Sequence, residues 1–454
     1  MSFKVVNPAN GTVLRVVDTW TEKQLDAALE QAAAAAPDWR ALPLAERCRL
    51  LTRVGEVLRA RREELARTVT GEMGKLITEA RGEVDKCAWV CDYYADNAAA
   101  FLADEPIETD AGRSLVAYQP LGTVLAVMPW NFPLWQVMRF AAPALAAGNT
   151  GLLKHASNVP HCAQLLEEVF LEAGVPAGVF TSLMIPSSMV ARVIGDPRVH
   201  AVTLTGSEPA GKAVAAAAGQ HLKKSVLELG GSDAFVILED ADLELAVDQA
   251  VASRFLNAGQ SCIAAKRFIP VTAIADEFVE RFRVKVEELR CGDPMDESTR
   301  LAPMARFDLR DDLHQQVVDT LAKGAVAVTG CMPQPGDGAW YQASILDRVE
   351  PGMRAYSEEL FGPVAIVIRA ADEADAVRIA NDSDFGLGGS VWTRDAERGE
   401  RVARRLECGS AFVNGLVKSD PRLPFGGVKR SGYGRELSLL GIREFVNAKT
   451  VWVR

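Results

Sequence analysis

The chain has 454 residues, of which 48% are hydrophobic and 24% charged, a balance that supports large buried cores and excludes a largely disordered chain. At about 150 residues per domain, this length predicts about three domains or lobes. Fifty basic and sixty acidic residues leave a net charge of −10. That charge argues against general nucleic-acid binding, which needs clustered Lys and Arg, although a local basic patch stays open.

Cysteine and histidine are sparse. The eight cysteines and five histidines lie scattered along the chain without the ligand spacing of a structural zinc site, so we expect no metal. Free thiols are typical of the reducing cytoplasm. The N-terminus lacks the pattern of a signal peptide, and no stretch reaches the roughly 18 to 20 apolar residues of a membrane span. We therefore expect a cytoplasmic protein with no membrane or nucleic-acid partner.

Helical patterns dominate the first hundred residues. Apolar residues recur with a period close to 3.6 from Leu50 to Val69, and Gly74 follows as a C-terminal stop. We expect helices over 22–36, 45–73 and 77–102, with the mixed charges of the last two on faces exposed to solvent.

After residue 115, short apolar strands alternate with helices. Strands are expected at 124–128, 151–154, 180–183, 199–205 and 226–229, and helices from Pro160 up to Gly174, at 187–195 and at 208–219. This alternation is typical of βαβ units and a parallel sheet, which binds ligands beyond the carboxyl ends of its strands.

A second α/β section runs from about 231 to 425. Its expected strands are 235–238, 267–271, 326–329, 364–368 and 410–414, and its expected helices are 242–256, 275–290, 308–323, 372–380 and 395–406. The long irregular stretches 292–306, 330–361 and 415–435 are candidates for functional loops, because loops of that length in compact enzymes often carry function.

One turn imitates a nucleotide-binding loop. GSEPAGK at 206–212 fits the first seven positions of G-x-x-x-x-G-K-[ST], but Ala213 replaces the hydroxyl residue that would hold magnesium. Pro209 has no N–H to offer a phosphate. We therefore disfavour an ATP hydrolase. The same turn, with Gly206 and Ser207, would still place a helix N-terminus near a dinucleotide pyrophosphate.

Three polar residues lie where chemistry is expected. Cys262 follows a polar, glycine-containing turn, Glu228 ends a strand before two glycines, and Asn131 stands between prolines after another strand. A thiolate nucleophile needs such a partly exposed turn, and an amide such as that of Asn131 can donate to a developing oxyanion. The plain alternatives are an inert core cysteine, a surface carboxylate and an ordinary turn asparagine.

Together, seven segments resemble the aldehyde dehydrogenase family, in its order and at about its spacing across nearly the whole chain. They are PWNFP at 129–133, Lys154, TGS at 205–207, ELGG at 228–231, GQSC at 259–262, EELFGP at 358–363 and PFGGVKRSGYGRE at 424–436. The resemblance implies an α/β fold with a Rossmann-like cofactor-binding domain over 1–102 and 121–229 and an α/β catalytic domain over 230–430. A small β oligomerisation arm over 103–120 and 440–454 would build a homodimer or homotetramer.

The resemblance also implies roles. Cys262 would attack the aldehyde, Asn131 and the Cys262 N–H would hold the oxyanion, and Glu228 would activate the water that hydrolyses the thioester. NAD or NADP would be held by Pro129, Trp130, Lys154, Ser157, Gly206, Ser207, Leu229, Glu359 and Phe361. No metal is needed.

Two positions depart from the family pattern. Many NAD-preferring members carry Glu where this chain has Ser157, so we expect NADP to be tolerated. Ser232 stands where Lys is common, and we have no functional account of it.

For the substrate, Arg139 lies eight residues after Asn131 among apolar neighbours, a costly place for a charge unless it meets an anion. It resembles the arginine with which succinate-semialdehyde dehydrogenases clamp a distal carboxylate, a task that suits a planar guanidinium. The alternative is an arginine paired with a nearby carboxylate of the chain. The second arginine of those enzymes is Leu256 here, so Ser419 and Lys418, near Phe425, are expected to replace it.

We therefore expect an ω-semialdehyde substrate, with succinate semialdehyde first. Glutarate semialdehyde or a broad aldehyde range stays open. A non-catalytic relative is disfavoured, because it would not need Cys262, Glu228 and Asn131 together.

Overall fold

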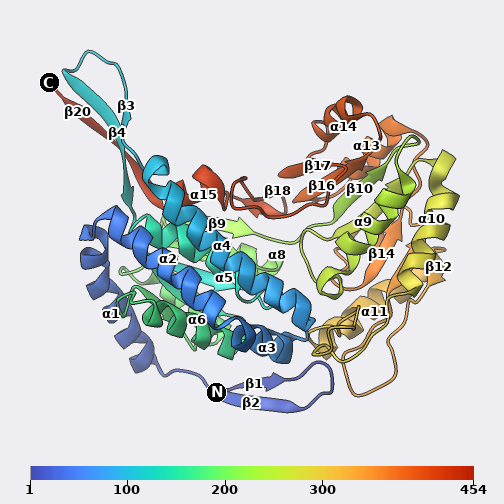
Figure 1. The fold of residues 1–454 in the computed structure, drawn as a ribbon, viewed down its shortest axis with the longest axis horizontal. Coiled ribbons are helices and arrows are strands. Elements are labelled where there is room, and N and C mark those ends of the chain that lie inside the picture. The colour runs from blue at the N-terminus through green and yellow to red at the C-terminus, as the bar shows by residue number, and fades with distance from the viewer. Residues whose placement is uncertain (1) are drawn as a thin grey trace.

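The computed structural model describes residues 2–454 and contains two α/β lobes and a projecting arm (Figure 1). No helix in that range is both long and apolar enough to cross a membrane. The arrangement agrees with the expected aldehyde dehydrogenase architecture of parallel sheets flanked by helices.

The first lobe is built on a six-stranded sheet of order β19-β9-β8-β5-β6-β7, which is parallel except for β19. Its strands are β5 (Thr123–Met128), β6 (Thr150–His155), β7 (Phe180–Ser182), β8 (Ala201–Thr205), β9 (Lys224–Glu228) and β19 (Gly432–Tyr433). The direction of winding reverses between β5 and β8, which pair directly. Ligands bind at such a switch point, beyond the carboxyl ends of the strands.

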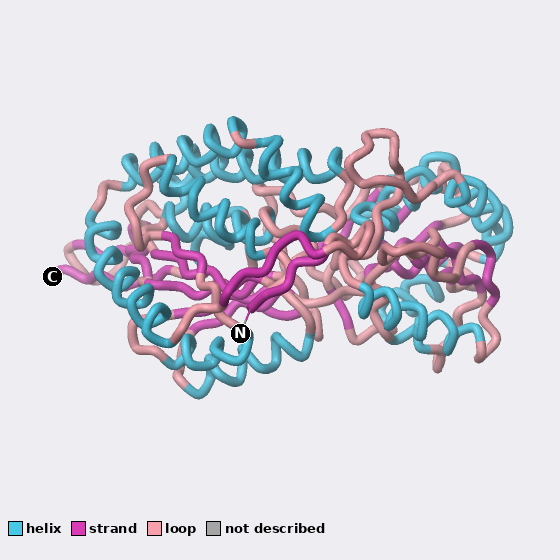
Figure 2. The backbone as a smooth tube through the Cα atoms, turned by 90° about the horizontal axis from the view of Figure 1, so that it is seen from below, coloured by secondary structure: helices cyan, strands magenta, loops and turns pink. Residues whose placement is uncertain are grey.

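Helices cover both faces of this sheet (Figure 2). They are α1 (Glu22–Ala41), α2 (Leu44–Ala60), α3 (Arg62–Met73), α4 (Ile77–Phe101), α5 (Trp135–Ala146), α6 (Pro160–Glu172), α7 (Val190–Gly195, after the short turn η1 at Ser187–Met189), α8 (Glu208–Gln220) and α15 (Ser438–Arg443). The helix expected over 45–73 is wrong in one respect. It breaks at Arg61, whose φ of −94° and ψ of 15° separate α2 from α3.

The second lobe has a seven-stranded sheet of order β12-β13-β14-β11-β10-β16-β17, parallel except for β12. Its strands are β10 (Asp233–Ile237), β11 (Ala265–Pro270), β12 (Val326–Thr329), β13 (Ser344–Asp347), β14 (Val364–Val367), β16 (Gly388–Trp392) and β17 (Ser410–Val413). Its helices are α9 (Leu243–Phe255), α10 (Thr272–Glu287), α11 (Phe307–Leu321), α12 (Arg354–Ser357), α13 (Glu373–Asn381) and α14 (Ala396–Ala403). The expected strand list omits β13 and β16.

Three small β elements complete the fold. The hairpin β1 (Ser2–Val6) and β2 (Val13–Asp18) crosses the base of the molecule, and β15 (Phe385–Gly386) pairs with β18 (Val428–Lys429). The arm consists of β3 (Glu105–Pro106), β4 (Arg113–Pro120) and β20 (Val446–Val453). The arm was expected to begin again at residue 440, but α15 occupies 438–443 and packs against α4 and α5 of the first lobe.

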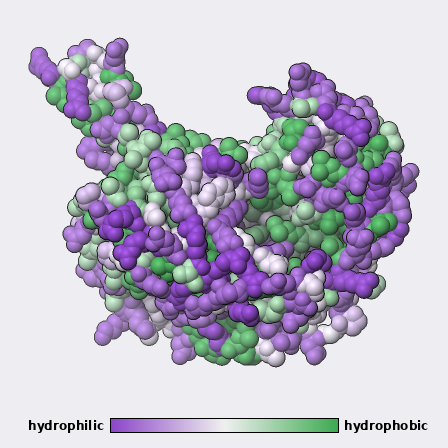
Figure 3. Space-filling model, viewed as in Figure 1, coloured by the Kyte–Doolittle hydropathy of each residue, from purple (hydrophilic) through white to green (hydrophobic). Residues whose placement is uncertain are grey.

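A notch separates the two lobes beside the arm, and one of its walls is largely hydrophobic (Figure 3). The lobes meet through two crossings of the chain. Glu228 ends β9 and Asp233 begins β10, so the carboxyl edge of the first sheet leads directly into the amino edge of the second. Residues 430–432 carry the chain back to the first lobe, where β19 pairs with β9. The segments expected to carry chemistry therefore meet between the lobes.

Candidate active site

The switch point of the first sheet forms one wall of a cavity of about 240 Å³. Pro129, Trp130 and Asn131 follow β5, and Gly206 and Ser207 follow the neighbouring β8. The other residues around the cavity are Gln136, Thr205, Leu229, Gly230, Cys262, Leu309, Glu359 and Phe361. The structure therefore brings most of the expected cofactor residues together beside the expected nucleophile.

The turn that carries Cys262 has an unusual backbone. Asn257 and Ala258 have φ values of 53° and 51°, and Gly259 has 73°, a left-handed region that residues other than glycine rarely adopt. A Cβ on Gly259 would collide with the carbonyl oxygen of Gly362 and with Arg254. Glycine is therefore required here by both the conformation and the close packing.

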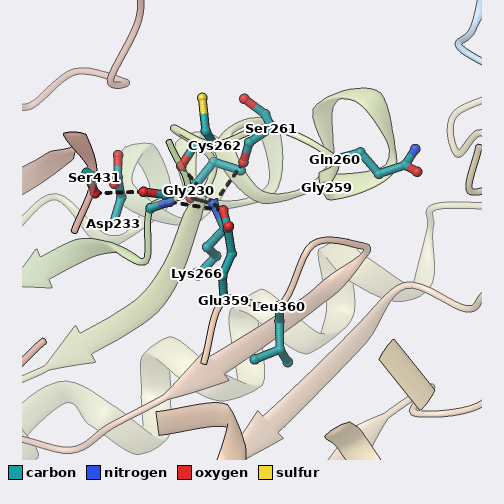
Figure 4. A network of polar contacts seen from close by, with 12 residues as sticks. Gly230, Asp233, Gly259, Gln260, Ser261, Cys262, Lys266, Glu359, Leu360 and Ser431 are labelled. Atoms are coloured by element: carbon teal, nitrogen blue, oxygen red, sulfur yellow. Dashed lines mark hydrogen bonds and ion pairs between the residues drawn. The ribbon is translucent and has the colours of Figure 1, made fainter. Parts of the chain in front are cut away.

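Two buried cations hold this turn. Arg254 donates to the carbonyl oxygens of Gly259 at 2.7 Å and Ala265 at 3.1 Å. Lys266 Nζ donates to the carbonyl oxygens of Ser261 and Cys262, both at 2.8 Å, and pairs with Glu359 Oε1 at 3.1 Å. In Figure 4 Lys266 and Glu359 lie below the turn, while the Cys262 sulfur points to the opposite side. The network fixes the backbone and leaves the thiol free to face a substrate.

The Cys262 thiol is half-buried and makes no disulfide. Burial raises the pKa of this thiol to about 12, while the charges of Arg139 and Lys266 lower it. Its backbone N–H donates to no acceptor within residues 2–454. An N–H of this kind, next to the nucleophile, is suited to a developing oxyanion.

Asn131 is tied into the same turn. Its Nδ2 donates to the carbonyl oxygen of Gln260 at 3.0 Å, and its own carbonyl oxygen accepts from Asn257 Nδ2 at 2.8 Å. The side chain of Gln260 points away from Cys262 and accepts from Ala305 N at 2.8 Å. The structure thus joins Asn131 to the segment that carries Cys262.

Glu228 is the last residue of β9 and lines neither cavity next to Cys262. It is 2% exposed, and neither carboxylate oxygen has a hydrogen-bond partner in the described chain. Burial raises its pKa well above the usual range, the nearby Glu436 raises it further, and Arg139 lowers it. A Cβ on Gly426 would press against Oε1 of Glu228, so glycine at 426 leaves room for the carboxylate.

A second cavity, of about 310 Å³, opens on the other side of Cys262. The expected substrate residues Arg139, Ser419 and Phe425 line it, together with Lys86, Trp135, Leu256 and Lys418. Gln136 and Cys262 border both cavities. Cys262 is thus placed between one cavity with the expected cofactor residues and another with the expected substrate residues.

Arg139 is not an uncompensated charge, contrary to the simplest form of the substrate-clamp expectation. It is 2% exposed and its Nε pairs with the carboxylate of Glu436. Its guanidinium stacks 4.5 Å from the ring centre of Phe425. Arg139 therefore has a carboxylate partner in the chain and also lines the cavity, and its role as a substrate clamp stays a prediction.

Lys154 and Ser157 lie outside the cofactor cavity, at and beyond the carboxyl end of β6. Lys154 is buried, and burial lowers its pKa. Ser157 is exposed and borders a separate cavity of about 540 Å³ that Lys4 and Arg306 also line. Their assignment to the adenosine end of a dinucleotide stays a prediction.

The site residues fit a nicotinamide dinucleotide. Gly206 and Ser207 precede α8, whose N-terminus provides free N–H groups for phosphate. Trp130 and Phe361 meet edge to face with ring centres 5.8 Å apart at the cavity wall. A Cβ on Gly230 would collide with Glu359, so this glycine keeps the carboxylate of Glu359 at the cavity.

The match of residues 206–212 to a nucleotide-binding motif has a different structural explanation. Lys212 is 72% exposed in its side chain and pairs with Glu208 of its own helix. A Cβ on Gly211 would collide with Leu229. The glycine therefore serves the packing of α8, and the lysine does not point toward the cofactor cavity.

The sequence reasoning missed four residues of this region, Lys86, Gln136, Lys266 and Glu436. Lys86 falls among the charges of 77–102 that were expected to face solvent, although it adjoins the apolar Cys87 and Val90 on the helix. Lys266 begins an otherwise apolar strand, which is a signal for a buried partner. Glu436 belongs to the quoted motif, but no partner for it is visible without the fold.

The site and the fold define a class of enzyme. The family model for the aldehyde dehydrogenase family matches residues 1–451, and the chain belongs to this family. It is 51% identical over 447 residues to a protein of Escherichia coli named succinate semialdehyde dehydrogenase [NAD(P)+] Sad, with 98% of this chain and 97% of that one covered.

Two further relatives have names of the same kind. A probable succinate-semialdehyde dehydrogenase [NADP(+)] of Synechocystis sp. is 49% identical over 455 residues, with both chains fully covered. The crystal structure of succinic semialdehyde dehydrogenase from Streptococcus pyogenes in complex with NADP+ superposes with a TM-score of 0.98 at 42% identity, covering 99% of each chain.

Proposed function

We propose that this protein oxidises succinate semialdehyde to succinate, with NADP or NAD as the hydride acceptor. The observation that carries the proposal is the position of Cys262 between a cavity with a dinucleotide-type lining and a cavity bordered by Lys86, Arg139 and Lys418. The names of relatives that share about half of its residues over the full length support the same substrate and cofactor class.

In the first step, the Cys262 thiolate adds to the aldehyde carbon, and the carbonyl electron pair moves to oxygen. The Cys262 N–H and Asn131 Nδ2 hold this oxyanion, and one such donor is typically worth about 3 to 4 kcal/mol. The bound cofactor supplies the acceptor for the hydride that leaves the substrate carbon. The carbon then remains attached to Cys262 as a thioester.

Hydrolysis of the thioester needs a base. Glu228 is the candidate because its carboxylate is shielded from water, which raises its pKa well above the usual range and makes it a stronger base. The residue would take a proton from water as water attacks the thioester carbon, and Cys262 would leave as thiolate. Since Glu228 lines neither cavity, this role requires its side chain to turn toward Cys262.

The test is a panel of aldehydes assayed through the absorbance of the reduced nicotinamide, with NAD and NADP in parallel. We expect the highest kcat/KM for succinate semialdehyde, with glutarate semialdehyde and butanal behind it. Equal kcat/KM for all three would favour the broad-range alternative, and a preference for glutarate semialdehyde would change the assigned substrate.

The same assay tests the nucleophile. Cys262→Ala is expected to lose at least about 1000-fold in kcat while still binding the cofactor, because within residues 2–454 no other thiol borders either cavity. Cys48→Ala is the control, since Cys48 is a half-buried thiol of α2 that lines neither cavity. Substantial turnover by the pure Cys262→Ala protein would contradict the mechanism.

A further inference from the structure

The charges around the substrate cavity are mostly balanced by the chain itself. Lys75 pairs with Glu83, and Arg139 pairs with Glu436, all of them buried. Glu79 accepts from Asn257 N at 3.0 Å, and burial raises its pKa, which favours its neutral form. Lys75 and Arg139 therefore each have a carboxylate partner within the chain.

Lys86 is the exception. It lies on α4 with its Nζ 2.8 Å from Ser419 Oγ and 4.3 Å from the centre of the Trp135 ring. Trp135 Nε1 donates to the same Ser419 oxygen at 3.0 Å. Within residues 2–454, no carboxylate oxygen lies within ion-pair distance of Lys86 Nζ. Three polar groups from three segments therefore converge on one end of the cavity, and one of them is an unpaired cation.

The carboxylates nearest to Lys86 are committed elsewhere. Besides its pair with Lys75, Glu83 accepts from the N–H groups of Leu134 at 2.8 Å and Trp135 at 3.0 Å. Asp420 pairs with Arg422 at 2.6 Å and accepts from its backbone N–H at 3.0 Å. Glu83 cannot turn to Lys86 without leaving the buried N–H groups of Leu134 and Trp135 unpaired, and Asp420 already has a charged partner in Arg422. A ligand anion meets no such competitor.

We propose that Lys86, supported by the hydroxyl of Ser419 and the indole N–H of Trp135, is the specificity-determining residue that binds the distal carboxylate of the aldehyde substrate. This inference rests on the proposed function and gives its substrate class a specific anchor. Arg139 borders the same cavity, and its Nε is already paired with Glu436. Lys86 thus takes the place of the second clamp arginine, whose position is occupied by Leu256 in this chain.

The test compares kcat/KM for succinate semialdehyde with kcat/KM for butanal, a neutral aldehyde with the same number of carbons. In Lys86→Met the ratio of the two is expected to fall by about 10- to 100-fold, because a charge-assisted contact is lost only for the carboxylate substrate. The fall should come mainly from KM for the semialdehyde. Lys86→Arg, which keeps the charge, should recover a large part of the ratio.

Lys418→Met tests the rival assignment, because Lys418 is an exposed lysine at the border of the same cavity and has no ion pair in the described chain. A change in ratio below about 3-fold is expected there, since a charge in contact with water is screened. A loss in Lys418→Met that is absent in Lys86→Met would overturn the assignment. So would an unchanged ratio in a folded Lys86→Met protein.

The pH profile gives a second readout. Burial, followed by repulsion from Arg139, lowers the pKa of Lys86 to about 8. The other groups that face it are Glu83 and Cys87 on α4 and Asp420 on the loop after β17. Since the lysine loses its charge as the pH rises through about 8, the semialdehyde-to-butanal ratio should fall above that pH in the wild type. In Lys86→Met the ratio should be flat over the same range, and a fall of the wild-type size there would contradict the inference.

The two proposals fail in different ways. If the wild type shows no preference for succinate semialdehyde over butanal, the proposed function is wrong. If the wild type shows the preference and Lys86→Met keeps it, the function stands and the inference about Lys86 is wrong.

Discussion

At the scale of single residues, the loop after β6 decides how much charge the far end of a dinucleotide would meet. Lys154 is buried at the end of the strand, and its neighbour His155 points inward, with Nε2 2.8 Å from the carbonyl oxygen of Pro133. Burial lowers the pKa of His155 to about 4, so this ring is neutral at physiological pH. The positive charge near Ser157 on this strand therefore comes from Lys154 alone.

Ser157→Glu tests whether this position faces the 2′ group of the cofactor. Two like charges about 4 Å apart repel by about 4 kcal/mol at an effective dielectric constant near 20, and exposure of Ser157 reduces that effect. We expect kcat/KM with NADP to fall about 10- to 100-fold relative to NAD, about 1.4 to 2.8 kcal/mol. The measurement is the ratio of the two kcat/KM values in wild type and variant, and an unchanged ratio would show that Ser157 lies elsewhere.

The residues found from sequence and those missed differ in how far along the chain their contact partners lie. Cys262, Asn131 and Glu359 stand in contiguous motifs, so a short segment carries the signal. Glu436 and Lys86 act through residues far along the chain, Arg139 and Ser419. Only the fold brings such pairs together, and a lysine in a helix of mixed charge looks the same whether it meets solvent or a cavity.

At the scale of elements, regular strands and helices were predicted well because their apolar spacing follows the period of the element. The omissions have local causes. β16 reads Gly-Gly-Ser-Val-Trp, and its two glycines remove the strand signal, while β13 spans only Ser344–Asp347 within a long loop. The break at Arg61 leaves the apolar period intact, so the sequence predicts one helix where the structure has two.

The requirement for glycine in the left-handed turn before Cys262 can be measured as a change in the free energy of unfolding. In Gly259→Ala the new Cβ would be strained by the positive φ and would collide with Gly362 and Arg254. We expect a loss of about 2 to 5 kcal/mol in the free energy of unfolding and a large drop in kcat. Urea denaturation and steady-state assays give both quantities.

The control for that variant is Gly219→Ala. Gly219 lies in α8 and has no positive φ, and a Cβ added to it would meet no described atom within 4 Å outside its chain neighbours and the backbone of its own helix. Alanine is favoured over glycine inside a helix by about 1 kcal/mol. Equal stability losses in the two variants would show that the turn at Gly259 tolerates a side chain after all.

At the scale of the whole molecule, the arm has a strand edge that no other strand of residues 2–454 covers. It projects from the body with hydrophobic residues among polar ones (Figure 3). β20 is the outer strand of the three-stranded sheet, and its Trp452 and Val453 are each 51% exposed. An exposed apolar edge strand is a liability unless another strand or surface covers it.

We therefore expect a homodimer, or a tetramer built from dimers, by light scattering at micromolar concentration. Trp452→Glu should shift the population toward monomer, because it places a charge in the expected interface. Leu222→Glu is the control, since Leu222 is 96% exposed and lies outside the arm. A wild-type monomer under these conditions would contradict the expectation.

The return of the chain to the first lobe has a consequence for protein synthesis. β19 closes the edge of the sheet next to β9, Glu436 pairs with Arg139, and β20 completes the arm. All three belong to a segment that is synthesised well after Cys262. A nascent or truncated chain that already contains Cys262 therefore lacks β19 and Glu436, which lie beside Glu228 in the folded protein. The thiol is synthesised before the residues that complete the site around Glu228.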